Sequence, residues 1–192
     1  MVTVSTSPET ARTYHHGDLR SALVDAGLGA LKTTEIGELS LRQLARAVGV
    51  SATAVYRHFP DKRALLAALA DAGIEQLATA QQIAAAAAPA EQGFAATGRA
   101  YVRFALANPA LFRLIFVYAC PEGPTVFGNS LAARMLQDYA TALAPDPAEA
   151  QRMVVQAWAL VHGLAMLMLD GQLPADDSLI DRIIDTRTLF AR

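Results

Sequence analysis

Hydroxyl and guanidinium groups come together in a short segment of the chain, at Thr53, Tyr56 and Arg57. In a helix, residues three and four apart lie on one face, so these side chains would point the same way. They can donate hydrogen bonds to phosphate oxygens and reach the edges of bases. Val55 and Phe59 fall on the opposite face, where they would bury the helix against the protein. The segment therefore predicts a helix that lies against nucleic acid.

The residues before this segment predict a second helix and a tight turn. Ser40 and Gln43 fit a capping box at the start of that helix. Its buried face carries apolar residues at i, i+3, i+4 and i+7, namely Leu41, Leu44, Ala45 and Val48. Gly49 ends the helix because glycine tolerates the positive φ of a sharp turn, and Ser51 caps the next helix. Two-helix corners also occur in other all-α proteins, but the polar face favours a DNA-binding helix-turn-helix.

A lysine follows at the start of a third helical segment. Pro60 and Asp61 end the preceding helix and cap a new one, which places Lys62 in its first turn. Free backbone N–H groups and the positive end of the helix dipole favour a phosphate oxygen there. Because Lys62 opposes this dipole, an anionic partner explains it better than helix stability does. The alternative is a lysine that is simply solvated.

We predict that one set of residues from these helices contacts DNA. Thr53 and Arg57 would touch base edges or nearby phosphates. Tyr56, His58 and Lys62 would mainly hold the sugar-phosphate backbone. The complete predicted set is Arg42, Ser51, Ala52, Thr53, Tyr56, Arg57, His58 and Lys62.

Four stretches place aromatic, turn and capping residues at fixed offsets: 14–20 (YHHGDLR), 41–51, 56–59 (YRHF), and Lys62 with the leucines at 65 and 66. Together they resemble the N-terminal domain of TetR-family transcriptional regulators, over about the first third of the chain. The WALVHG stretch at 158–163, with Trp158, His162 and Gly163, resembles the hallmark of one subgroup of the family's C-terminal domains.

The resemblance implies a homodimeric all-α protein that binds a palindromic operator and releases it when a small molecule binds. Repression is implied as the family's usual mode. Activation, or a response to a protein partner or to no ligand, is the alternative.

Composition independently predicts an all-α fold with about nine helices. Hydrophobic residues make up 53% of the 192 residues, which excludes a disordered chain. Alanine and leucine are abundant and alternating β-branched runs are few, which favours helices. The alanine-rich stretch 83–90 is interpreted as poorly ordered or as a helix junction. The expected helices span 18–31, two short segments within 40–60, 61–80, 90–107, 110–119, 125–142, 147–170 and 177–190.

These elements group into four regions. Residues 1–13 form a flexible polar arm in which Arg12 could add DNA contacts. The helix-turn-helix domain covers 14–60, a linking helix and junction cover 61–88, and an effector-binding and dimerisation domain covers 89–192. Residues 1–70 contain eight Lys/Arg and six Asp/Glu, whereas residues 71–192 contain eight and twelve. A mildly basic end on an acidic body fits operator binding through that end and argues against non-specific coating of nucleic acid.

Aromatic residues in the last region are candidates for the walls of a ligand pocket. Apolar and aromatic walls with a few polar tips are typical of small-molecule sites, and they predict a small apolar or aromatic effector. Phe94 lies at helical spacing from Tyr101 and extends the same aromatic stripe. The alternative is that these aromatic residues belong to the ordinary hydrophobic core and that His162 is a hydrogen-bonded core residue. The predicted lining is Tyr101, Phe104, Phe112, Phe116, Tyr139, Trp158 and His162.

The last two expected helices, 147–170 and 177–190, are apolar nearly all round. A helix of this kind is buried on both sides, so we predict a homodimer in which both pair with the same helices of a second chain. Gly163 would allow a close helix contact there or against a neighbouring helix. A purely internal core is the alternative. Dimerisation would also place two recognition helices about one DNA turn apart and impose a palindromic operator.

Other classes of protein find little support. A single cysteine, Cys120, excludes an internal disulfide and fits a reducing cytoplasm; a redox-sensing role for it stays open. The start of the chain lacks a signal-peptide pattern, and the apolar run 157–169 is too short to span a membrane. No metal spacing, glycine-rich phosphate loop or catalytic motif is present, and His162 with Asp170 or Cys120 has no supporting spacing. We therefore predict a cytoplasmic protein that is not an enzyme and has no cofactor.

Overall fold

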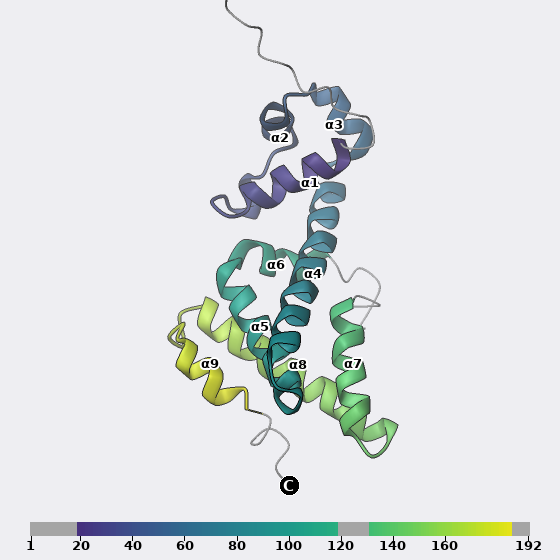
Figure 1. The fold of residues 1–192 in the computed structure, drawn as a ribbon. Helices are drawn as coiled ribbons and strands as arrows, with labels where there is room; N and C mark the ends of the chain where they lie inside the picture. Colours follow the sequence, from purple (N-terminus) through teal and green to yellow (C-terminus); the bar gives the residue numbers. More distant parts are fainter. Residues whose placement is uncertain (1–18, 119–130, 186–192) are drawn as a thin grey trace, which may run out of the picture.

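The structure is a computed structural model that describes residues 19–118 and 131–185. Over these residues the chain forms nine α-helices and two short 3-10 turns, without a β-strand, as the all-α prediction requires. Helices α1 to α3 gather at one end, α5 to α9 lie at the other, and α4 runs between them (Figure 1). The helices are α1 (Leu19–Ala30), α2 (Leu41–Val48), α3 (Ala52–His58), α4 (Lys62–Ala87), α5 (Gly93–Ala107), α6 (Pro109–Tyr118), α7 (Leu131–Leu143), α8 (Pro147–Leu169) and α9 (Asp177–Ile183).

The turn between α2 and α3 forms as the sequence predicts. Gly49 has a φ of 77°, in the left-handed region, and its N–H donates to carbonyl oxygens of the last turn of α2. The Ser51 side chain accepts a hydrogen bond from the Ala54 N–H at 3.2 Å and so caps α3. The capping box predicted at Ser40 is wrong, because the Ser40 side chain makes no capping hydrogen bond. Buried Leu39 and Leu41 on either side of it anchor the start of α2 instead.

Helices α1, α2 and α3 pack on one another, and α1 packs on α4. Val55 and Phe59 are 0% and 1% exposed, as expected for the buried face of α3. The guanidinium of Arg20 lies 5.3 Å from the centroid of the Phe59 ring, in a cation–π contact. A Cβ added to Gly27 of α1 would lie only 2.8 Å from a methyl of Leu69, so α1 crosses α4 at close range.

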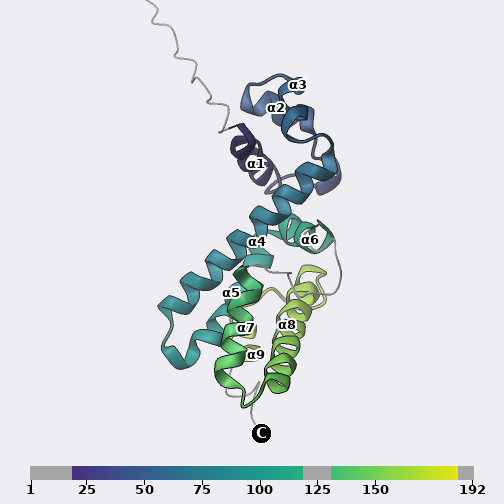
Figure 2. The same ribbon diagram turned by 90° about the vertical axis from the view of Figure 1, so that its right-hand side faces the viewer.

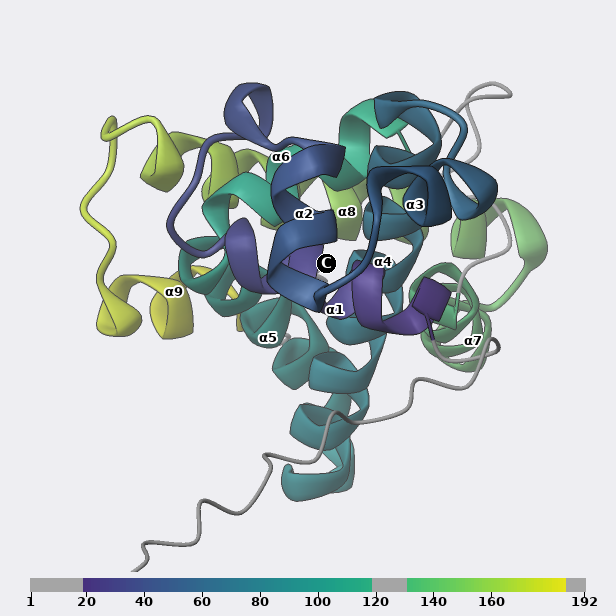
Figure 3. The same ribbon diagram turned by 90° about the horizontal axis from the view of Figure 1, so that it is seen from above.

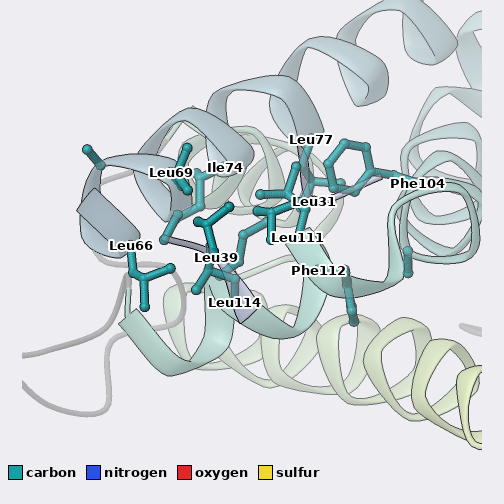
Figure 4. Packing of buried hydrophobic residues seen from close by; sticks show 14 of the residues in the cluster. Leu31, Leu39, Leu66, Leu69, Ile74, Leu77, Phe104, Leu111, Phe112 and Leu114 are labelled. Carbon is teal, nitrogen blue, oxygen red and sulfur yellow. The ribbon is translucent and has the colours of Figure 1, made fainter. Parts of the chain in front are cut away.

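Helix α4 is longer than predicted. It runs without a break for 26 residues to Ala87, so the predicted end near residue 80 is wrong. Of the two interpretations of residues 83–90, the helix junction is confirmed, because α4 ends at Ala87 and a 3-10 turn begins at Ala90. Alanine is the strongest helix former, and the helix ends only where Pro89 disfavours helical geometry at the residue before it. Figure 4 shows leucines of α4 in one cluster with Leu39 from the N-terminal end and with Leu111 and Leu114 of α6.

Helices α5, α6 and α7 pack on α4, and α8 packs on α5 and α7. Figure 2 shows α5 and α7 between α4 and α8, and α6 where α4 leaves the first three helices. A 3-10 turn at Ala90–Gln92 precedes α5. The chain bends by 108° between the segment Ala90–Ala107, which includes α5, and α6. Asp146 accepts from the Glu149 N–H at 2.9 Å and so caps the start of α8.

Helix α9 is shorter than predicted and is held on α5 by charged side chains. It ends at Ile183 rather than continuing to 190, because Ile184 leaves helical geometry and is buried. The Arg99 Nη1 donates to the Ile184 carbonyl at 2.9 Å. Arg103 pairs with Asp177 at 2.7 Å and with Asp181 at 3.0 Å.

One described helix, α8, is long and apolar enough to cross a membrane, because its 23 residues include a window of mean hydropathy 1.5. The apolar run 157–169 alone is too short to cross a membrane, but α8 begins ten residues earlier, at Pro147. A core helix of a soluble protein meets the same criteria, and α8 buries Val154, Val161 and Leu164 against its neighbours.

Some sequence predictions lie outside the described residues. These are the arm 1–13 with Arg12, the motif residues 14–18, Cys120, and the parts of the expected helices at 125–130 and 186–190.

Gly49→Ala tests the requirement for a positive φ in the turn. A Cβ at Gly49 or at Gly37 meets no heavy atom within 4 Å, but of the two only Gly49 has a left-handed φ. We expect Gly49→Ala to lower the free energy of unfolding by about 1–2 kcal/mol. The matched Gly37→Ala variant should change it by less than about 0.5 kcal/mol. Urea denaturation measures both, and equal losses would contradict this reading of the turn.

Candidate nucleic-acid interface and ligand cavity

One face of the two short helices is polar, cationic and open to solvent. Thr53, Tyr56 and Arg57 are exposed on α3, with 45% of Tyr56 accessible, and Arg42 is exposed on α2. Ser51 and Ala52 are also exposed at the start of α3, whereas His58 is half-buried. The sequences of α2 and α3 contain arginines and no acidic residue. Figure 3 looks down on these helices at the end of the molecule.

Lys62 has a partner that sequence reasoning missed. Its Nζ donates a hydrogen bond of 2.7 Å to the carbonyl of Gly37, in the loop between α1 and α2. The lysine therefore ties this loop to the start of α4, which explains its position better than simple solvation does. No sequence signal predicts a contact between a side chain and a backbone group so far apart in the chain. An ammonium group has three donors, so a phosphate contact is compatible with this bond.

A small cavity lies among α4, α5, α7 and α8, with a volume of about 40 Å³. Of the predicted ligand residues, Tyr101 and Trp158 line it, as does Phe94. None of its described lining residues is Asp, Glu, Lys, Arg or His. The other lining residues are Gln81, Ala95, Thr97, Gly98, Met135, Leu136, Ala157, Leu160, Val161 and Ile184.

The remaining predicted ligand residues lie outside that lining. Phe112, Phe116 and His162 form an aromatic cluster beside it, with the Phe116 and His162 rings 4.5 Å apart and the Phe112 and Phe116 rings 5.0 Å apart. Tyr139 stands edge-on to Phe94 with ring centroids 5.6 Å apart. Phe104 is buried in the main core.

A hydrogen bond joins the aromatic cluster to the cavity wall. The Tyr101 hydroxyl and His162 Nδ1 are 3.0 Å apart. Burial raises the pKa of Tyr101 far above its ordinary value. Burial lowers the pKa of His162 below 6.5. Both groups are therefore neutral near pH 7, and the hydroxyl can donate to an unprotonated Nδ1.

Gln81 is the polar lining residue that sequence reasoning missed. Its Nε2 donates to the Thr97 carbonyl at 3.3 Å, and its buried Oε1 has no hydrogen-bond partner in the described part of the chain. Its position four residues after buried Leu77 placed it on the inner face of α4, a signal that the alanine-rich surroundings obscured.

Comparisons with known proteins agree with this architecture. Residues 23–69 match the family model described as "Bacterial regulatory proteins, tetR family", and residues 94–187 match "Tetracyclin repressor-like, C-terminal domain". A search of curated proteins found no match.

Solved structures share the fold over nearly the whole chain. A protein with unknown function from Rhodococcus sp. RHA1 is 34% identical, with 91% of this chain and 93% of that chain covered and a TM-score of 0.71. A tetR-family transcriptional regulator from Streptomyces coelicolor is 20% identical, with 88% and 78% covered and a TM-score of 0.65. A TetR variant from Acinetobacter baumannii AYE in complex with minocycline is 22% identical, with 85% and 93% covered and a TM-score of 0.59.

A helix-turn-helix domain followed by a helical C-terminal domain defines a class of DNA-binding transcriptional regulators. Both parts of the chain match models of one family within that class. The chain belongs to the TetR family.

The His162 environment predicts a pH dependence of stability. Because burial lowers the folded-state pKa of His162, the unfolded chain binds a proton at higher pH than the folded chain. The stability contributed by neutral His162 is present above its ordinary pKa of 6.5 and is lost as the pH falls below it. Melting temperatures measured between about pH 8 and pH 5 should fall less in His162→Gln than in the natural sequence. The same pH dependence in both proteins would contradict this assignment.

Proposed function

We propose that the protein is a sequence-specific repressor that leaves a palindromic operator when a small molecule binds its C-terminal domain. The observation that carries this proposal is the path of α4. This helix begins at Lys62, directly after the exposed face of α3, and contributes Gln81 to the cavity wall. The bound minocycline of the Acinetobacter relative is in keeping with a ligand of this kind. Activation, or a response to a protein or to no ligand, would be the alternative.

The DNA contacts are assigned to the exposed set on α2, α3 and the start of α4. In this proposal Thr53 and Arg57 reach base edges or nearby phosphates, since both are exposed on the outer face of α3. Tyr56, His58 and Lys62 hold the backbone. Arg42, Ser51 and Ala52 lie at the margins of the same surface.

Coupling between cavity and DNA is assigned to the close contacts of α4. A Cβ at Gly73 would lie 2.9 Å from a methyl of Leu111 and 3.1 Å from Ile115, so α4 and α6 cannot slide past one another freely. The Gly27–Leu69 contact fixes α1 to the same helix. A ligand that binds better when α4 is displaced shifts the population by no more than its differential affinity for the two states. A coupling of about 1–3 kcal/mol is typical.

We assign the homodimer interface to α8 and α9. Val155, Ala159, Gly163 and Leu167 follow one another at four-residue intervals on the outside of α8, with 47% of Val155 and 40% of Leu167 exposed. A Cβ at Gly163 meets no atom within 4 Å, so no neighbour within the described chain requires glycine there. A second copy packed closely on this stripe would require it and would bury the exposed apolar side chains.

The proposal includes the division of the chain into an arm (1–13), a helix-turn-helix domain (14–60), a linking region (61–88) and an effector and dimerisation domain (89–192). A cytoplasmic location follows from the operator as partner.

Selection of bound fragments from random duplex DNA tests this function directly. We expect a palindrome whose half-sites are about one helical turn apart. A thermal-shift screen of small molecules, followed by operator-release assays, then identifies effectors. Failure to bind any duplex at low salt would overturn the proposal. Specific DNA binding that no small molecule affects would favour the alternative regulator without an effector.

Lys62→Gln tests the phosphate contact assigned to that lysine. We expect weaker binding to every duplex and a salt slope of log affinity reduced by about one unit. Lys62→Arg retains the charge and should keep the slope, and Arg63→Gln, at the exposed neighbouring residue, serves as the matched control. Fluorescence anisotropy over a salt series measures all three. A change in sequence preference alone would show the assigned role to be wrong.

Gly163→Glu tests the dimer interface. The new side chain has open space within the subunit and improves helix propensity, so each subunit should fold. At a close helix contact between copies it would clash and bury a charge, so we expect monomers in sedimentation analysis and loss of tight operator binding. Gly29→Glu, on α1 with equally open space, should leave the dimer intact. A dimeric Gly163→Glu protein would place the interface elsewhere.

A further inference from the structure

The cavity wall contains one hydrogen-bond acceptor that the described residues leave unused. The Gln81 Oε1 is buried without a partner, although a buried amide oxygen loses its water on folding. Its amide nitrogen is already committed to the Thr97 carbonyl at 3.3 Å. The side chain therefore presents an acceptor, and not a donor, to the cavity.

Two other polar side chains of the wall are engaged within the chain. The Thr97 hydroxyl donates to the Phe94 carbonyl at 2.7 Å. The Tyr101 hydroxyl bonds with His162 behind the wall. The rest of the lining is apolar, and none of its described residues carries a charge. An ionised ligand would lose its hydration here without gaining an ion pair, which is strongly unfavourable.

The volume of the cavity limits the size of ligand that binds without movement of its walls. Its volume of about 40 Å³ compares with the roughly 10–15 Å³ that one water requires on the same measure. A larger ligand must displace wall residues such as Met135, or Ile184 after the end of α9. Binding and structural change are therefore linked at this site.

We propose that the effector is a neutral, mainly apolar molecule with one N–H or O–H group, which donates a hydrogen bond to Gln81 Oε1. This inference rests on the proposed function, because it names the ligand class of the same cavity. It also gives a route for coupling. Gln81 lies on α4 and bonds to α5, so a ligand that engages its amide changes the link between the two helices.

Matched pairs of neutral probes test the ligand class. Indole and benzofuran have similar shape but differ in the N–H donor, as do pyrrole and furan; phenol and fluorobenzene differ in the O–H donor. Benzoate and benzylamine supply ionised comparisons. We expect the donor member of each pair to bind about tenfold more tightly in calorimetry, and the ionised probes to bind least.

The Gln81→Leu variant locates this preference. It should bind both members of a pair about equally, whereas Gln82→Leu, at the exposed neighbouring glutamine, should keep the preference. The inference would be overturned if the natural sequence bound both members of a pair equally, bound an ionised probe more tightly, or bound no probe at all. It would also be overturned if Gln81→Leu kept the preference for the donor. The comparison of probes in the natural sequence holds even if Gln81→Leu folds poorly. A donor preference without operator release would contradict the proposed function and leave the ligand class supported.

Discussion

The unbroken hydrogen-bond ladder of α4 is the constraint on which the rest of the structure depends. Its 26 residues extend about 39 Å, at 1.5 Å for each residue. It packs against α1 near its start and against α5, α6 and α7 further along. A helix without proline or a bulge bends little, so movement at one end must appear at the other. The protein thus has a physical connection between its two ends that requires no chain of individual side-chain contacts.

Small residues set how closely the other helices approach α4. Gly27 and Gly73 bring α1 and α6 so near that a methyl group at either position would meet a leucine side chain. Away from α4, Gly98 of α5 allows another close approach, because a Cβ there would lie 3.0 Å from Ile184 and 3.2 Å from Val161 of α8. Such contacts leave little slack, and close-packed interiors transmit displacement instead of absorbing it. The packing therefore suits a protein that has two discrete arrangements.

Signals within a few residues of one another were sufficient to predict the helix-turn-helix. Gly49, Ser51 and the apolar spacing around them act locally, and the structure places them as expected. Contacts between distant segments had no such signal. The bond from Lys62 to Gly37, the early end of α9 and the cavity wall at Gln81 each depend on how helices meet in three dimensions. Aromatic composition indicated Tyr101 and Trp158 of the cavity lining, but it could not separate them from the cluster behind.

The attachment of α9 has a consequence for how ionic strength acts on this protein. Charged side chains on α5 hold α9 and the chain after it, and Ile184 in that chain forms part of the cavity wall. These pairs are exposed to solvent, and dissolved salt weakens ion pairs of this kind. An electrolyte series therefore perturbs the far end of the molecule as well as any charged surface near α3. Osmolytes that leave ionic strength unchanged would separate the two effects.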